Sequence, residues 1–183
     1  METVILFGSP HQNGVTAELL NALKTSLPAD ETLTQVDCFA LGAKPCVDCG
    51  GCKRQRGCVQ HDLDEVYAAI ERADRLVVAT PIYNRSFSAP LKTVIDRLQP
   101  YWCARFVRGE KPPIAKPKQA VLLTTCESAA ETGDGAVVEA QLRPALTVLN
   151  ASFVGAVHAS DCGKGLSAAA VAAATKLFGA FDQ

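Results

Sequence analysis

Four cysteines lie close together in the sequence, at spacings that could bring their sulfur atoms to one centre. Cys46, Cys49, Cys52 and Cys58 are separated by two, two and five residues. Cysteine thiolates are soft ligands, and such a compact run is typical of an iron–sulfur cluster. A structural zinc site more often divides its ligands between two knuckles joined by a longer segment, so zinc is the second interpretation. The motif therefore predicts a loop that binds a metal cluster.

A second segment, residues 8–16, combines glycine with hydroxyl and amide side chains and follows a short apolar run. Between a buried strand and a helix, such a loop presents backbone N–H groups and the positive end of the helix dipole to an anion. Ser9, Asn13 and Thr16 could add hydrogen bonds, and Gly14 would permit close approach. The segment lacks the lysine of a Walker A loop and any G-x-G-x-x-G run, which favours a mononucleotide phosphate. The simpler alternative is that Ser9 or Asn13 only caps the helix.

The hydrophobic pattern indicates which elements position these two loops. Short apolar or alternating runs bounded by turn residues predict five strands, at residues 4–7, 33–39, 75–80, 119–125 and 152–158. Apolar residues at helical spacing predict five helices, at about residues 15–27, 62–72, 89–98, 136–149 and 167–181. Asp62 or Asp64 would cap the second helix. The cysteine loop, at about residues 44–61, precedes that helix, and a polar, proline-rich connection is expected from Gln99 to Lys118.

Strands that alternate with helices predict an α/β fold, a doubly wound five-stranded parallel sheet with helices on both faces. Ligands of such sheets bind beyond the carboxyl ends of the strands, where the strand order reverses. The loops that begin near Gly8, Thr80 and Thr125 should therefore line one pocket. A length of 183 residues with 48% hydrophobic content suits a single domain over residues 1–183.

The composition narrows the class of protein. Eighteen Lys and Arg against nineteen Asp and Glu leave a net charge of -1, which argues against a nucleic-acid-binding surface. The start of the chain has no basic region, and no apolar run approaches the roughly 18 residues of a membrane span, so we expect a cytoplasmic protein. In a reducing compartment, eight cysteines indicate metal or redox chemistry. Cys38, Cys103 and Cys162 are expected to be simple packing residues, whereas Cys126 should face the ligand pocket.

Two segments at the expected separation resemble the NADPH-dependent FMN reductase superfamily, whose members are flavodoxin-like. The first is the loop at residues 8–16, and the second runs over residues 80–84 and 89–97. The resemblance implies that FMN lies across the carboxyl edge of the sheet. Its phosphate would be surrounded by residues of the first loop, namely Ser9, His11, Asn13, Gly14, Val15 and Thr16. The residues implied near the ring system are Pro81, Ile82, Tyr83, Asn84 and Ser86, with Thr125 and Cys126 from a third loop.

The cysteine motif resembles the cluster loop of the iron–sulfur flavoproteins, a branch of the same superfamily. In that branch the loop stands between the second strand and the second helix, the place that it has here. The resemblance implies a [4Fe–4S] cluster bound by Cys46, Cys49, Cys52 and Cys58. Zinc and free thiols remain the alternatives.

Together these features predict an oxidoreductase that transfers electrons between a reduced donor, NAD(P)H or ferredoxin, and an acceptor through FMN and a cluster. Flavin chemistry requires no acid or base from the chain, so no catalytic side chain is predicted. The alternatives are an NAD(P)H-dependent FMN or quinone reductase without a cluster, and a non-catalytic electron carrier or zinc-stabilised module.

Association of the chain with itself is a further expectation. The segment from Leu98 to Pro113 carries Tyr101, Trp102 and Phe106 among polar residues, which is typical of an interface. We therefore expect a homodimer or homotetramer. The alternative is a lid that packs over the monomer's own pocket.

Overall fold

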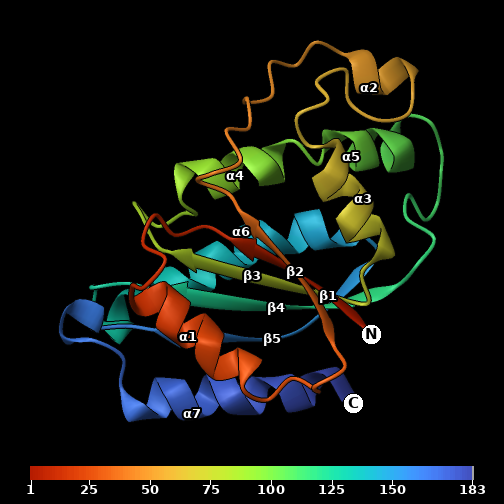
Figure 1. Ribbon diagram of the computed structural model, residues 1–183. Coiled ribbons are helices and arrows are strands. Elements are labelled where there is room, and N and C mark those ends of the chain that lie inside the picture. The colour runs from red at the N-terminus through yellow and green to blue at the C-terminus, as the bar shows by residue number, and fades with distance from the viewer. Residues whose placement is uncertain (183) are drawn as a thin grey trace.

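A five-stranded sheet forms the centre of the molecule in the computed structural model, which describes residues 1–182 (Figure 1). The strands are β1 (Glu2–Phe7), β2 (Thr32–Asp37), β3 (Arg75–Pro81), β4 (Lys118–Thr125) and β5 (Ala151–Ala159). All neighbouring strands are parallel, in the order β2-β1-β3-β4-β5. Strand addition reverses direction between β2 and β3, so the switch point lies at the carboxyl ends of β1 and β3. The predicted doubly wound, flavodoxin-like sheet is confirmed.

Helices connect the strands and cover both faces of the sheet. They are α1 (Val15–Lys24), α2 (Gly51–Arg54), α3 (Asp64–Arg72), α4 (Ala89–Asp96), α5 (Gln99–Phe106), α6 (Asp134–Val148) and α7 (Ala168–Leu177). Short 3-10 turns follow at η1 (Ala130–Thr132), η2 (Cys162–Lys164) and η3 (Phe178–Asp182). In the described part of the chain, no helix combines the length and the apolar character needed to cross a membrane.

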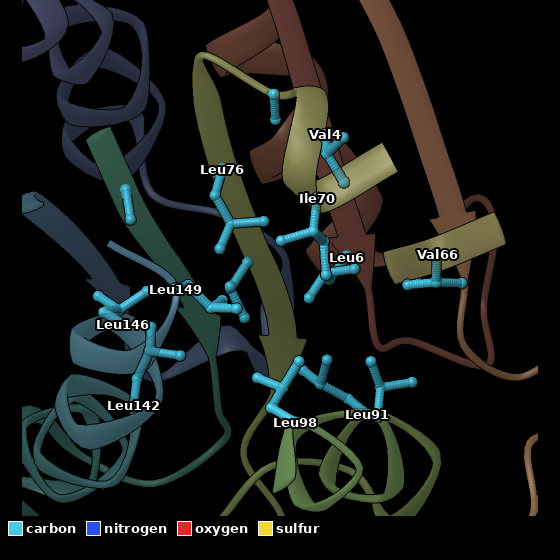
Figure 2. Close-up of a cluster of buried hydrophobic side chains, with 14 of the residues drawn as sticks. Val4, Leu6, Val66, Ile70, Leu76, Leu91, Leu98, Leu142, Leu146 and Leu149 are labelled. Atoms are coloured by element: carbon cyan, nitrogen blue, oxygen red, sulfur yellow. The ribbon is translucent and has the colours of Figure 1, made fainter. Parts of the chain in front are cut away.

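The alternation of side chains along the strands divides the core in two. Val4 and Leu6 of β1 pack with the layer that contains α3 to α6, whereas Ile5 and Phe7 pack with α1 and α7. Figure 2 shows the first of these cores, where leucines from α4 and α6 meet the same face of β1 and β3. Because helices cover both faces, β3 and β4 are buried along almost their whole length.

The turn after β1 depends on a glycine. The Gly8 N–H donates to the Ala79 carbonyl at 2.8 Å, which keeps the chain close to β3. A Cβ atom at Gly8 would lie 2.8 Å from Leu91 Cδ2 and 2.9 Å from Leu91 Cβ on α4. A larger residue would therefore push α4 away from the sheet edge, because closely packed side chains yield only slightly.

The clearest difference from the sequence analysis is α5, which stands where a polar connection was expected. Pro100 lies in the first turn of this helix, where the missing N–H of proline costs nothing. Tyr101, Cys103 and Ala104 are buried. The expected connection from Gln99 to Lys118 is therefore wrong in its first half, because the proline marks a helix start.

Three smaller differences concern two helix ends and one additional short helix. Neither Asp62 nor Asp64 caps α3; Leu63 precedes the helix, and the Asp62 carboxylate accepts hydrogen bonds from Arg97 instead. The first helix ends at Lys24, three residues before the expected end. Cys52 lies in the short α2 and not on an open loop.

Candidate functional site

A cavity of about 460 Å³ lies at the carboxyl ends of the central strands. The loops after β1, β3 and β4 meet there, as expected from the switch point of the strand order. Ten of the predicted cofactor residues line the cavity: Ser9, His11, Gly14, Val15, Thr16, Pro81, Ile82, Tyr83, Thr125 and Cys126. A volume of this size is in the range of sites for small cofactors.

The first loop brings two buried hydroxyl groups to this cavity. Ser9 and Thr16 are each 3% exposed. The Ser9 hydroxyl accepts a hydrogen bond from the His11 N–H at 3.2 Å, and the Thr16 hydroxyl lies 2.7 Å from that of Thr125 on β4. Gly14 precedes α1, so the helix begins without a capping side chain at that position. The first turn of α1 therefore offers its N–H groups to a ligand, and neither Ser9 nor Asn13 caps the helix.

The second loop turns sharply after Pro81. The Ile82 N–H donates to the Thr125 carbonyl at 2.8 Å, and Tyr83 and Ser86 exchange two backbone hydrogen bonds of 3.0 Å. Asn84 lies at the tip of this turn with a φ of 50°. Positive φ is uncommon outside glycine, and asparagine tolerates it better than most residues. The second loop is therefore a defined hairpin-like turn at the rim of the cavity.

Three predicted residues lie outside the lining of the cavity. Asn13 and Asn84 are exposed on their loops. The Ser86 hydroxyl donates to Gln141 Oε1 on α6 at 2.9 Å. The Asn84–Ser86 turn is also held by Arg85, whose Nε lies 3.0 Å from Asp134 Oδ1. These contacts bind the second loop to α6 and direct Ser86 away from the cavity.

Sequence reasoning missed three residues that line the cavity: Glu127, Ser128 and Cys162. Cys162 follows β5, and its N–H donates to the Cys126 carbonyl at 2.9 Å. Burial raises the pKa of the Cys162 thiol. The sequence pattern contained a signal for Cys162. The predicted fifth strand ends at the same sheet edge as the fourth, so the loop after it could have been included among the loops that line the pocket.

The four motif cysteines line a small recess of about 30 Å³. Cys103 of α5 lines it as well. All eight cysteines of the chain are free thiols. Within residues 1–182, no three His, Cys, Asp or Glu side chains come together in a geometry that could hold a metal ion. The fold thus gathers the predicted ligands around one recess without drawing them to one point.

Arg97 anchors both ends of the cysteine loop. Its guanidinium donates to the Lys44 carbonyl at 2.6 Å, to the Gln60 carbonyl at 2.9 Å and to Asp62 Oδ1 at 2.8 Å. The Lys44 N–H donates to the other Asp62 oxygen at 2.8 Å, which closes the ring of contacts. The hydrogen bond from Arg97, followed by that from Lys44, lowers the pKa of Asp62 to about 2. Arg97 therefore has a structural role in holding this loop.

One cysteine outside the motif lies in direct contact with it. The sulfur atoms of Cys52 and Cys103 are 3.4 Å apart. Burial, together with the hydrogen bond to Cys103, raises the pKa of Cys52 to about 11. Cys103 is thus a neighbour of the motif, which its isolated place in the sequence did not indicate. His61, by contrast, pairs with Asp64 at 2.8 Å, and both side chains are largely exposed.

Known proteins resemble this chain in sequence and in fold. An iron–sulfur flavoprotein of Archaeoglobus fulgidus is 32% identical over 114 residues, which are 60% of this chain and 51% of that protein. An iron–sulfur flavoprotein of Methanocaldococcus jannaschii is 30% identical over 105 residues, 55% of this chain and 53% of its own. The chain thus spans about half the length of these curated relatives. The NAD(P)H:quinone oxidoreductase from Methanothermobacter marburgensis shares the fold, with a TM-score of 0.77 and 22% identity over 97% of this chain and 96% of its own.

The family model described as NADPH-dependent FMN reductase matches residues 1–164. This match includes both cofactor loops and the whole cysteine motif. It confirms the predicted resemblance at the level of the family. The chain belongs to the NADPH-dependent FMN reductase family.

Proposed function

We propose that the protein binds FMN in the carboxyl-edge cavity and transfers electrons from a reduced donor, NAD(P)H or ferredoxin, to an acceptor. The observation that carries this proposal is the meeting of the loops after β1, β3 and β4 around one cavity of about 460 Å³. Membership of the family supports FMN as the occupant. The similarity to NAD(P)H:quinone oxidoreductase adds support for the fold alone.

The FMN phosphate would bind at the start of α1. The N–H groups of the first helical turn and the helix dipole favour an anion there. Ser9 and Thr16 are buried and line the cavity. The Ser9 hydroxyl is placed to donate to phosphate oxygen, and the Thr16 hydroxyl could do so when Thr125 is the donor of their shared hydrogen bond. His11, Gly14 and Val15 complete this end, and Asn13 stands on the exposed side of the loop. The polar lining fits a phosphate monoester.

The flavin ring would bind against the second and third loops. Pro81, Ile82 and Tyr83 line this end together with Thr125 and Cys126. Asn84 and Ser86 would act through the turn that they form, which holds Tyr83 at the rim. Tyr83 is 47% exposed, so a donor can approach the ring end from solvent.

Bound FMN would supply hydride transfer and single-electron transfer. The chain's own residues bind and orient the cofactor. The hydrogen bond between Thr16 and Thr125 joins the start of α1 to the end of β4 and so holds the first and third loops together. Backbone N–H groups of the loops donate to carbonyl and hydroxyl oxygens of neighbouring residues, so we expect the site to be preformed.

Cys46, Cys49, Cys52 and Cys58 are proposed to hold a [4Fe–4S] cluster, which would exchange one electron at a time with the flavin. The donor set fits, because four thiols line one recess and the Arg97 contacts position their loop without using a sulfur atom. Gly50 and Gly57, with φ of 70° and 77°, flank the ligands and give the loop freedom to close around a cluster. The names of both archaeal relatives support the same proposal.

A second candidate is an NAD(P)H-dependent FMN or quinone reductase that carries no cluster. It is favoured by the absence, among the residues that the structure describes, of three converging metal ligands. Both candidates share the FMN site and differ only in the cysteine loop.

Anaerobic purification followed by quantification of FMN, iron and acid-labile sulfide separates the two. We expect FMN bands with a broad iron–sulfur absorption in the visible spectrum. Cys49→Ser should remove most of the iron and sulfide and leave FMN bound, because the phosphate site is formed by a different strand end.

The matched control is Cys38→Ser, a buried cysteine eight positions before the motif. It should leave iron and sulfide unchanged. Negligible iron in anaerobic wild type, with a spectrum that Cys49→Ser does not alter, would contradict the cluster. Retained FMN and NAD(P)H oxidation in such a protein would establish the second candidate.

A further inference from the structure

Cys52 and Cys103 are 51 positions apart in the sequence, yet their sulfur atoms lie 3.4 Å from each other. Cys52 belongs to α2, within the cysteine motif, and is partly exposed. Cys103 belongs to α5 and is 1% exposed. The four-cysteine motif already supplies a complete ligand set, so the fifth thiol at its edge has no role in the proposed function.

Contacts that involve no sulfur atom hold these two elements together. Arg108, just beyond the end of α5, donates from Nη1 to the Cys52 carbonyl and, at 3.2 Å, to the Gln55 carbonyl. Glu110 accepts from Arg108 Nε at 2.9 Å and lies 3.0 Å from Arg56. Cys52 and the residues that follow it are therefore fixed to the end of α5, which keeps the two thiols close without a bound metal.

We propose that Cys52 and Cys103 form an intramolecular disulfide when the cysteine loop carries no cluster. A disulfide has an S–S distance of about 2.05 Å, so the sulfur atoms must approach by about 1.4 Å from their present separation. Movement of this size needs side-chain rotation and a small shift of α2, which is four residues long. Cys103 would remain where α5 holds it.

The oxidant would be a small disulfide of the glutathione class, written RSSR. The Cys52 sulfur attacks one sulfur of RSSR, forms a mixed disulfide and releases one RSH. The Cys103 sulfur then attacks the Cys52 sulfur, forms the internal disulfide and releases the second RSH. In sum, two cysteine thiols are oxidised, RSSR is reduced to two RSH, and both thiol protons leave with the products.

This disulfide excludes Cys52 from metal binding, because one sulfur cannot serve both as a cluster thiolate and in a disulfide. It would join α2 to α5 and keep the sulfur atoms of Cys52 and Cys103 from further oxidation. The exclusion of the cluster rests on the proposed function, whereas the disulfide itself does not.

Peptide mapping tests the pairing directly, because the sequence separates the relevant cysteines. Cys103 is the single cysteine of the tryptic peptide 98–105, whereas Cys52 lies in peptide 25–53, where Pro45 blocks cleavage after Lys44. Full-length protein is freed of metal, reduced, treated anaerobically with oxidised glutathione, alkylated and digested. Mass spectrometry of wild type should show peptide 98–105 joined to peptide 25–53.

Variants assign the partner within peptide 25–53. The cross-linked species should disappear in Cys52→Ser and in Cys103→Ser. It should persist in Cys38→Ser and Cys49→Ser, which remove other cysteines of the same peptide. The proposal is overturned if Cys103 of wild type is recovered alkylated, or if the cross-link survives in Cys52→Ser.

Reconstitution with iron and sulfide tests the link to the cluster. Reduced protein should take up iron, and glutathione-oxidised protein should take up at least tenfold less until a reductant is added. Equal uptake by the two forms would overturn the exclusion. If reduced wild type takes up no iron, the cluster proposal fails while the peptide map still decides the disulfide.

Discussion

At the scale of single residues, the buried hydroxyl groups of the first loop are the most direct test of the cofactor site. Ser9 lines the cavity, and its oxygen also accepts the His11 N–H at 3.2 Å. The hydroxyl also donates to the His11 carbonyl at 3.4 Å, a long hydrogen bond that it can exchange for a phosphate oxygen while the His11 N–H still holds the turn. Thr16 differs, because its hydroxyl is already paired with Thr125 across the sheet edge.

Ser9→Ala should weaken FMN binding and leave the fold intact. Loss of one hydrogen bond to a charged phosphate oxygen costs about 1.5–3 kcal/mol, or about tenfold to hundredfold in Kd. Fluorescence titration of the apoprotein with FMN measures this change. The matched control is Ser26→Ala, at the opposite end of α1, whose hydroxyl donates to the Leu23 carbonyl at 2.7 Å. Equal affinity of both variants and wild type would remove Ser9 from the phosphate site.

At the scale of elements, the position of the cysteine loop depends on one arginine of the α4–α5 junction. The Arg97 side chain is 1% exposed and the Asp62 side chain 25% exposed. Arginine suits this place because its planar guanidinium can donate in several directions at once. The loop between β2 and α3 is thus held at its two ends by Arg97, and at Cys52 and Gln55 by Arg108.

Arg97→Met should destabilise the protein by about 3 kcal/mol, the lower end for a broken buried ion pair, because Asp62 retains some solvent. Urea unfolding followed by circular dichroism measures the loss. The control is Lys92→Ala on α4, whose exposed pair with Asp96 at 2.6 Å should contribute less than about 0.5 kcal/mol. Similar losses in the two variants would contradict the anchoring role of Arg97.

The Asp62 carboxyl should make the free energy of unfolding depend on pH. Its pKa falls from 3.8 to about 2 in the folded protein, so the folded state binds fewer protons than the unfolded state between these values. The stabilisation is fully present above pH 4 and is lost as the pH falls toward 2. Urea unfolding at a series of pH values should show that the free energy of unfolding falls less between pH 4 and pH 2 in Asp62→Asn than in wild type. Parallel profiles would show that Asp62 does not carry the dependence.

At the scale of the whole molecule, α5 and the residue after it expose an aromatic and aliphatic surface. Trp102, Phe106 and Val107 are 44%, 55% and 49% exposed, and the rings of Trp102 and Phe106 lie 5.3 Å apart. Tyr101 of the same helix is buried against Tyr67 of α3. The outward side of α5 therefore resembles the centre of an interface more than a lid that packs on its own chain.

We expect the protein to form a homodimer or homotetramer through this surface, and Trp102→Glu to shift it toward monomer. Light scattering at micromolar concentration measures the mass. Trp102 is the sole tryptophan of the chain, so its fluorescence in wild type should shift to shorter wavelength as the concentration rises. The control is Leu33→Glu on β2, where the side chain is 43% exposed. A monomeric wild type would establish that this surface has no self-association role.

The sequence by itself determined the parallel sheet, its five strands and the convergence of three loops on one cavity. Each rests on a local pattern: apolar runs such as Val4 to Phe7 define buried strands, and turn residues such as Gly8 end them. The carboxyl ends of parallel strands share one edge of the sheet. The sequence alone therefore predicts that the loops that carry Thr16 and Thr125 lie close together.

Only the tertiary structure decided which distant side chains complete the sites. It placed Cys103 beside Cys52 and Arg97 between Lys44 and Asp62. It also showed that the segment after Gln99 is a helix that packs its buried side under the cysteine loop. Such contacts depend on how the helices of one layer pack against each other and against the sheet. That packing is determined by the shapes of many side chains together, and no local period or spacing in the sequence contains it.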